Sequence, residues 1–331
     1  MPSDRRFTAL LCSSLLCSAL FWCTGAWAEG DWAPLYEHVN PELQESLDAV
    51  MAGNPGWSKL IRDKRMSIGV VDLSGPEPRF ARVNGNEMMY AASLPKIAIL
   101  LAAYVSLEAG TLPDTPDVRK DMADMIRVSS NSAATRMIDR IGMERIDEIL
   151  MDPKYDLYDE SRGGGLWVGK RYAKEGRRLP DPMHGISHGA TATQICRFYY
   201  LLATEKLVGP KWTQQMMDDM SDPHLNHKFV YAIKKRAPEA TLYRKSGTWR
   251  TWHSDSVWVK GKGWRNYILT AMVDSTDGER IIRELLPAIE PILLEPIARR
   301  AVRLPKAIAD SEPPAVQTGD RSATPTREKD V

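Results

Sequence analysis

The pattern of apolar and polar positions divides the chain into strands near both ends and a block of helices between them. Short apolar runs at residues 66–73 and 79–83, separated by a turn rich in Gly and Pro, are typical of a hairpin. Three further runs of strand type lie at residues 241–249, 254–260 and 266–273. Because these strands flank the helices, we expect one antiparallel sheet with an inserted helical lobe. The predicted fold class is α/β, of the α+β type.

The expected helices have apolar residues at helical spacing. They are residues 40–64 with a break near 54–56, the segment from Ser93 to about Gly110, residues 114–150 with a break at 128–131, residues 191–205, residues 209–220, and a last helix from Glu279 towards Val302 that is interrupted by Pro287 and Pro291. Residues 152–182 lack a regular pattern, and a loop of this length is usually functional or mobile. We therefore assign the sheet lobe to about 29–90 and 221–303 and the helical lobe to about 91–220, with a site expected in the cleft between them.

The most apolar helix begins close to a serine. Residues 97–105 are uncharged and too few to span a membrane, so we expect a buried helix. Pro95 is tolerated only in the first turn, which places Ser93 at the N-terminal end and Lys96 one turn later. There the amine can take the hydroxyl proton, and the helix end can stabilise an oxyanion. An N-capping serine with a surface lysine is the alternative, but a lysine that opens a buried helix is expected to have a lowered pKa.

A second candidate motif is Ser129-Ser130-Asn131. It falls in the predicted break between two amphipathic helices. A hydroxyl in such a break can pass a proton to a leaving nitrogen, and an amide can hold a substrate carbonyl. The same three residues also form ordinary turns and helix caps, so the motif alone does not establish a site.

A third candidate motif is Lys245-Ser246-Gly247-Thr248, inside a predicted strand. In a regular strand, the first and third of these residues share one face, and the second and fourth share the other. A glycine within a strand often marks the close approach of another backbone or of a ligand. The alternative is a charged residue on an edge strand.

Both ends of the chain differ from the rest in composition. Two arginines, a largely apolar run and Ala26-Trp27-Ala28 predict that residues 1–28 are a secretory signal cleaved before Glu29. The mature protein would then be secreted, most simply into the periplasm, without a stable membrane anchor; an uncleaved N-terminal anchor is the alternative. Residues 304–331 are rich in Pro, Ser, Thr and charged groups and are expected to be a disordered tail.

Charge, cysteine and histidine usage exclude several classes of function. Removal of residues 1–28 would leave 42 basic and 42 acidic side chains, so the balance gives no reason to expect a nucleic-acid partner. Cys196 is the one cysteine after residue 28, which excludes an intramolecular disulfide, and its apolar helical context indicates a core residue. The six histidines show no metal-ligand spacing, so we expect neither a metal nor another cofactor.

Taken together and in this order, the three motifs resemble the signature of penicillin-recognising serine enzymes, most closely the class A β-lactamases. The resemblance covers roughly residues 40–300 and includes the order of strands and helices and the apolar helix behind Ser93. It implies a β-lactamase/D,D-peptidase-like fold for a hydrolase domain at residues 29–303.

The resemblance also implies a role for each matching residue. Ser93 would be the acylated nucleophile, Lys96 its proton partner, and Ser129, rather than Ser130, the proton shuttle. The remaining assignments are Asn131 for the substrate amide, Lys245 and Ser246 for the substrate carboxylate, Gly247 within the same strand motif, and the backbone N–H groups of Ser93 and Thr248 for the oxyanion hole. Arg250 is a candidate carboxylate anchor and is equally typical of a protein surface.

The sequence departs from the family pattern at three places. Ser130 replaces an aspartate, which should change how the loop is braced. The interval from Ser93 to Ser129 is short for a class A enzyme, so one wall of the cleft is expected to be missing. The loop at residues 152–182 lacks the Glu-x-x-x-Asn pattern that carries the deacylating base, and Glu160 fits a solvated loop acid better than that base.

Three functions are consistent with these features. The first is a secreted serine hydrolase of the β-lactamase type that acts on a β-lactam or related amide, with slow deacylation. The second is a cell-wall D,D-peptidase acting on a peptidoglycan-type peptide. The third is a non-catalytic peptidoglycan-binding module on the same fold. The intact Ser93, Lys96 and Lys245 argue against the third function, and the missing glutamate weakens the first relative to the second.

Overall fold

The computed structural model describes the backbone of residues 34–303 and the side chains of residues 34–294. The predicted signal at residues 1–28 and the predicted tail at residues 304–331 lie outside the described residues. Within the described part of the chain, no helix is both long enough and apolar enough to cross a membrane.

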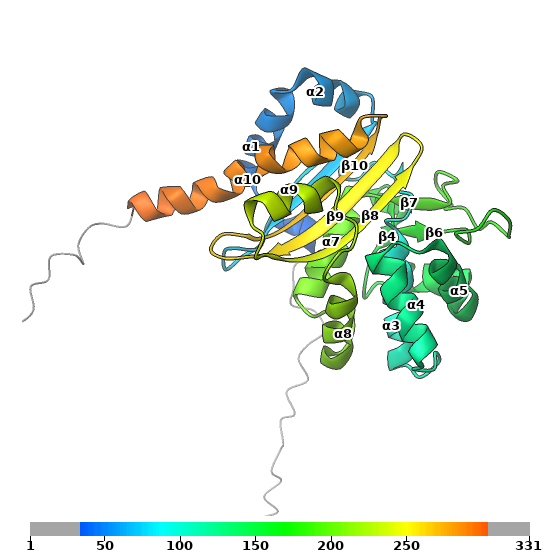
Figure 1. The fold of residues 1–331 in the computed structure, drawn as a ribbon. Coiled ribbons are helices and arrows are strands. Elements are labelled where there is room, and N and C mark those ends of the chain that lie inside the picture. The colour runs from blue at the N-terminus through cyan, green and yellow to red at the C-terminus, as the bar shows by residue number, and fades with distance from the viewer. Residues whose placement is uncertain (1–33, 304–331) are drawn as a thin grey trace, which may run out of the picture. The chain divides into compact units, whose positions relative to one another are not determined.

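A five-stranded antiparallel sheet forms the centre of the fold (Figure 1). Its strand order is β2-β1-β10-β9-β8, with β1 at Met66–Asp72, β2 at Arg79–Val83, β8 at Thr241–Trp249, β9 at Trp252–Lys260 and β10 at Asn266–Asp274. β1 pairs directly with β10, with Ile68 opposite Ala271. The early and late strands therefore join one sheet, as predicted. β8, which carries the Lys245 motif, is an edge strand.

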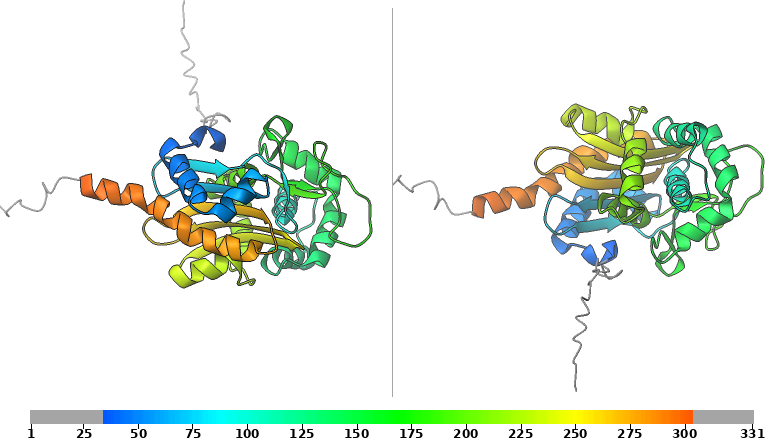
Figure 2. Two further views of the ribbon diagram at one scale, coloured as in Figure 1. Left: turned by 90° about the horizontal axis from the view of Figure 1, so that it is seen from above. Right: turned by 90° about the horizontal axis from the view of Figure 1, so that it is seen from below.

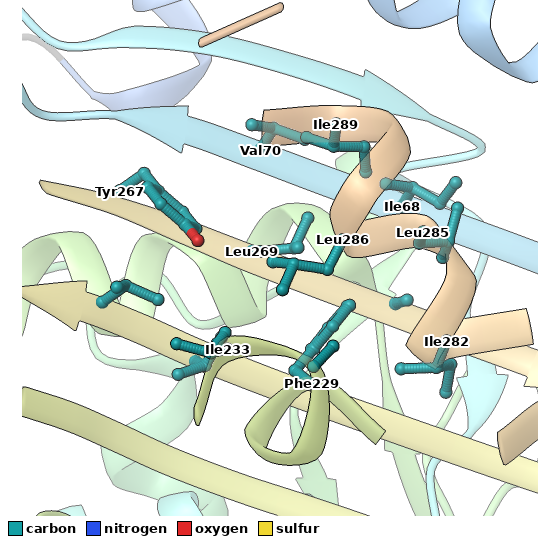
Figure 3. Close-up of a cluster of buried hydrophobic side chains, with 14 of the residues drawn as sticks. Ile68, Val70, Phe229, Ile233, Tyr267, Leu269, Ile282, Leu285, Leu286 and Ile289 are labelled. Atoms are coloured by element: carbon teal, nitrogen blue, oxygen red, sulfur yellow. The ribbon is translucent and has the colours of Figure 1, made fainter. Parts of the chain in front are cut away.

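Helices cover both faces of this sheet, because side chains alternate between the faces along each strand. On one face, Ile68, Val70 and Leu269 pack against α10 (Gly278–Arg303), α1 (Pro41–Ala52) and α9 (Lys228–Arg236), as Figure 3 shows for part of the cluster. On the other face lies α7 (Ala192–Ala203), so close that a Cβ at Gly69 would be 2.6 Å from Cys196 Sγ. Cys196 is fully buried, which agrees with its predicted place in the core, and α7 packs on the sheet although it falls within the segment assigned to the helical lobe.

The other helices lie beside the edge of the sheet that β8 forms (Figure 2). They are α3 (Lys96–Glu108), α4 (Pro116–Arg127), α5 (Asn131–Ile141), α6 (Met143–Met151) and α8 (Pro210–Met220). α3 is buried at every position except Val105 and Glu108, because α4, α5, α6 and α8 all pack on it. This explains why its sequence is apolar on all sides.

The remaining elements are short. They are η1 (Leu35–His38), α2 (Pro55–Arg62), β3 (Met89–Tyr90), β4 (Tyr158–Asp159), η2 (Glu160–Arg162), β5 (Gly164–Gly165), β6 (Trp167–Val168) and β7 (His188–Ala190). β3, β7 and β6 form a small sheet, and β4 pairs with β5. The loop at residues 152–182 is therefore tied down by short ladders, which the irregular sequence did not predict.

Three predictions about helices were wrong. The predicted helix at residues 114–150 is also divided at Gly142, whose φ of +91° ends α5. α9 lies at Lys228–Arg236, where no helix was predicted, and its apolar side packs on the main core. α10 continues through Pro287 and Pro291. Both prolines face solvent, where water can satisfy the carbonyls that lose their intrahelical partners.

Candidate active site

Ser93 lies in a tight turn immediately before α3. The carbonyl of Ser93 accepts a 3.3 Å hydrogen bond from Lys96 N, so the chain enters the helix through a 3₁₀-type turn. Ala92, just before it, has a φ of +53°, a conformation that costs an L-residue about 1–2 kcal/mol. Tertiary contacts hold this strained turn, because the carbonyl of Ala91 accepts from Ser254 Oγ at 2.7 Å and that of Ala92 accepts from Tyr172 OH at 3.1 Å. The Ser93 hydroxyl is half-buried and forms no hydrogen bond with another described residue.

The Lys96 amine is fully buried at the base of the cleft. Nζ donates to the Ser129 carbonyl and to Asn131 Oδ1, each at 2.7 Å, and lies 3.4 Å from Ser129 Oγ. Burial lowers the pKa of Lys96 to about 7, and no carboxylate within the described residues opposes this shift. A large fraction of the amine is therefore neutral near pH 7 and able to accept a proton.

Ser129 lies between two amines. Lys245 Nζ donates to Ser129 Oγ at 2.8 Å and to the Ser246 carbonyl at 2.7 Å, while Lys96 approaches the same hydroxyl from the opposite wall. Burial, and next the positive charge of Lys96, lower the pKa of Lys245 well below its usual value. While Lys245 is an ammonium, its Nζ can only donate to Ser129 Oγ, so the Ser129 proton is then available for a third group.

Ser130 has a different role from Ser129. Its hydroxyl accepts from Ala133 N at 3.2 Å and caps α5, and its own N–H donates to the Asp124 carbonyl at 3.0 Å. The structure therefore brings Ser129 into the cluster of amines and leaves Ser130 as a helix cap, in the position where the related family has an aspartate.

The β8 strand approaches the Ser93 turn at Gly247. A Cβ on Gly247 would lie 2.3 Å from the Ala91 carbonyl oxygen and 2.6 Å from Ser93 N, so no other residue fits there without moving the turn. The close backbone approach expected from this strand glycine is confirmed. It brings the backbone of Gly247 beside the Ser93 N–H.

Two residues in contact with β8 were missed in the sequence. His227 Nε2 lies 3.3 Å from Ser246 Oγ, and burial lowers the pKa of His227 to about 4. Lys228 is fully buried and donates to the Gly247 carbonyl at 2.6 Å, to Thr248 Oγ1 at 2.8 Å and to the Ser254 carbonyl at 3.0 Å. No local pattern distinguishes this lysine from a surface lysine, because its partners lie 19 to 26 residues away.

A pocket of about 530 Å³ adjoins the cluster. Its walls include Asn131, Tyr172, His188, Tyr90 and Trp249. Trp249 is 56% exposed, and thus forms an apolar rim at the end of β8. The pocket can accept a flat or apolar substituent of a molecule held at Ser93.

Two other candidates have no described hydrogen bond or ion pair with Ser93, Lys96, Ser129 or Lys245. Arg250 is exposed in the turn after β8, with its guanidinium 5.7 Å from the Trp249 ring centre. Glu160 is exposed in η2 and has no described contact with Ser93, Lys96 or Ser129. In the same short helix, the Arg162 guanidinium stacks over the Tyr36 ring at 3.4 Å.

Comparison with known proteins supports the family resemblance. The β-lactamase from Sphaerobacter thermophilus is similar in structure over 76% of this chain and 96% of its own, with 14% identity and a TM-score of 0.57. PBP-A matches 78% of this chain and 97% of its own, with 17% identity and a TM-score of 0.55. The TLA-3 extended-spectrum β-lactamase matches 75% of this chain and 99% of its own, with 11% identity and a TM-score of 0.58. At these identities the likeness shows the fold.

The sequence comparisons assign the family. No curated protein matches the chain. Residues 113–289 match the model of the beta-lactamase enzyme family, a segment that includes Ser129 and Lys245. The resemblance to penicillin-recognising serine enzymes and the expected β-lactamase/D,D-peptidase-like fold are thereby confirmed. The chain belongs to the beta-lactamase enzyme family.

Proposed function

We propose that this protein is a serine hydrolase that forms an acyl-enzyme through Ser93 with a β-lactam or a related amide. The observation that carries the proposal is the position of Ser129 Oγ, 2.8 Å from Lys245 Nζ and 3.4 Å from Nζ of Lys96, which follows Ser93 by one turn. Both amines contact neutral oxygens, and both approach the same hydroxyl.

The acylation step follows from this geometry. Neutral Lys96 takes the hydroxyl proton of Ser93, and Ser93 Oγ attacks the carbonyl carbon of the amide. The N–H groups of Ser93 and Thr248 stabilise the negative charge on the carbonyl oxygen. Ser129 then gives its proton to the amide nitrogen as the C–N bond breaks, and it regains a proton from Lys96. The product is an ester at Ser93, and no proton is lost or gained overall.

The strand residues would bind the substrate. Lys245 and Ser246 would meet its carboxylate, Asn131 its amide, and the pocket walled by Trp249 and Tyr172 its acyl substituent. A variant of PBP-A has been solved as an acyl-enzyme complex with penicillin G; that chain is 17% identical to this one, with a TM-score of 0.55. This precedent on a shared fold favours penicillin as the first probe.

Deacylation is proposed to be slow. Hydrolysis of the ester needs a base that deprotonates a water molecule, and such a base typically contributes ~10²–10⁴ in rate. Among the described residues, no carboxylate contacts Ser93, Lys96 or Ser129. This observation favours a D,D-peptidase acting on a peptidoglycan-type peptide as the second candidate, since both functions share the acylation step.

A single incubation tests the proposal. The protein, its Ser93→Ala variant and a Ser161→Ala control are mixed with a fluorescent penicillin, and adducts are counted by intact-protein mass spectrometry. We expect one adduct on the wild type and on the control and none on Ser93→Ala. An adduct that persists on Ser93→Ala would refute the assignment of the nucleophile. A wild type that forms no adduct with penicillin or with a D-alanyl-D-alanine ester would support the third candidate, a non-catalytic binding module.

Secretion remains a proposal that depends on residues 1–28. Sequencing the N-terminus of the protein recovered from a bacterial periplasm would test it. A mature protein that begins at Glu29 is the expected result, and an intact Met1 in a membrane fraction would support the N-terminal anchor instead.

A further inference from the structure

Tyr172 occupies the side of the cleft next to Lys96. Its ring centre lies 4.5 Å from Lys96 Nζ, and its hydroxyl donates to the Ala92 carbonyl at 3.1 Å. One side chain thus contacts both the amine that is proposed to accept the proton and the strained residue that precedes the nucleophile. No sequence motif marks Tyr172, because it comes from the loop at residues 152–182.

His188 holds this ring in place from behind. The two ring centres are 4.2 Å apart, and His188 Nε2–H donates to the Lys170 carbonyl at 2.9 Å. Burial lowers the pKa of His188 to about 4, so the imidazole is neutral near pH 7 and packs as an aromatic wall. Tyr90 also contacts His188 edge-on, with ring centres 6.2 Å apart. The Tyr172 ring is therefore packed against His188, while its hydroxyl is held by the Ala92 carbonyl.

The position of Tyr172 has a chemical consequence. Burial raises the pKa of the phenol well above its usual value, so Tyr172 stays protonated and cannot serve as a base. The ring instead fills the space beside the amine in which a water molecule could be deprotonated. By excluding water from this position, the ring would also contribute to the desolvation that lowers the pKa of Lys96.

We infer that Tyr172 is a positioning residue that excludes water from Lys96 and from the ester at Ser93, and that it thereby prolongs the lifetime of the acyl-enzyme. The inference depends on the proposed acylation of Ser93. With the ring removed, a water molecule beside Lys96 would lose its proton to the neutral amine and attack the ester carbon. Ser93 Oγ would leave and recover that proton, which releases the acid and restores the enzyme.

The experiment compares Tyr172→Ala and Tyr172→Phe with the wild type. Each protein is acylated with penicillin, excess reagent is removed, and the decay of the adduct is followed by mass spectrometry. We expect the adduct to decay about 10-fold faster in Tyr172→Ala, a part of the ~10²–10⁴ that a well-placed base contributes. Tyr172→Phe keeps the ring and should retain a long-lived adduct. Tyr231→Ala, a tyrosine on α9 outside the cleft, is the matched control.

A second readout separates this role from simple packing. The midpoint of the pH dependence of acylation should rise above 7 in Tyr172→Ala, because hydration favours the charged form of Lys96. The other titratable groups near the amine are Lys245 and His188; His188 is already neutral in this range, and Lys245 is in contact with Ser129 rather than with Tyr172.

The outcomes are distinct. An unchanged adduct lifetime together with an unchanged pH midpoint in Tyr172→Ala would overturn the inference. If that variant does not fold, Tyr172→Leu, which keeps the apolar packing but leaves room for a water, is subjected to the same two measurements and the same criterion. A wild type that is never acylated would instead refute the proposed function.

Discussion

The two walls of the cleft each contain a buried lysine, and the two lysines have different surroundings. On the helical wall, the Lys96 amine contacts neutral oxygens and an aromatic ring, and burial brings its pKa to about 7. On the strand wall, Lys228 donates three hydrogen bonds to β8 and β9, and the nearby Asp255 opposes the effect of burial, so its pKa is about 8. The first arrangement favours loss and gain of a proton, and the second favours a fixed geometry.

The comparison shows that two fully buried lysines can differ in the partners that compensate their charge. Lys228 is enclosed by backbone carbonyls and lies beside the buried Arg244–Asp255 ion pair, which joins β8 to β9. Its charge therefore has compensating partners. Lys96 lacks a carboxylate partner among the described residues and lies one turn from a free hydroxyl. The difference in partners is what separates the two roles, and it can be tested by removing each lysine.

Lys96→Ala should have the largest effect. We expect acylation to slow by ~10²–10⁴, which is about 2.7–5.4 kcal/mol of barrier, because the general base is lost. Stopped-flow mixing with a fluorescent penicillin measures the rate, and Lys59→Ala, an exposed lysine paired with Asp63, is the control. A folded Lys96→Ala protein with wild-type acylation would assign the base to another residue.

Lys228→Met should have a smaller effect on rate and a clear effect on stability. The carbonyls of Gly247 and Ser254 would lose a buried donor, which costs about 1–3 kcal/mol per unsatisfied group. With the Thr248 N–H less firmly placed, we expect acylation to slow by about 10-fold, less than the ~10²–10³ seen when an oxyanion donor is removed. Urea unfolding and the same stopped-flow assay measure the two effects. A slow variant of unchanged stability would argue for a direct chemical role of Lys228.

The pH dependence of acylation should identify Lys96 rather than Lys228 as the base. A base with a pKa of about 7 is increasingly protonated below pH 7, so the rate should fall towards tenfold per pH unit on the acid side. Because the unfolded chain binds a proton that buried Lys96 does not, the contribution of Lys96 to the free energy of unfolding should rise from pH 7 to about 10.4. An acid limb that persists in Lys96→Ala would contradict this assignment.

Glu160→Gln should have the smallest effect. Since Glu160 is exposed and makes no described contact with the cluster, both acylation and adduct lifetime should match the wild type within experimental error. The measurement is the decay of the isolated adduct. A longer adduct lifetime in Glu160→Gln would show that Glu160, and not Lys96, supports hydrolysis of the ester.

The helical wall was more predictable than the strand wall. Ser93 and Lys96 are separated by one helical turn, so local spacing was enough to place them together. The strand glycine at 247 was also predictable, because a missing side chain inside a strand signals close approach. Lys228 and Tyr172 act through contacts with segments 19 to 80 residues away, and such contacts leave no local pattern. The same reason explains why α9 and the short ladders of the 152–182 loop were missed.

The contact between Gly69 and Cys196 gives this protein an internal reporter. Cys196 is the only cysteine from residue 34 to the C-terminus, it is fully buried, and burial raises the pKa of its thiol to about 12. The thiolate is the reactive form, so a thiol reagent cannot modify this residue while α7 stays on the sheet. The rate of labelling at Cys196 therefore reports how often α7 separates from the sheet, in the native protein and in each variant of the cleft.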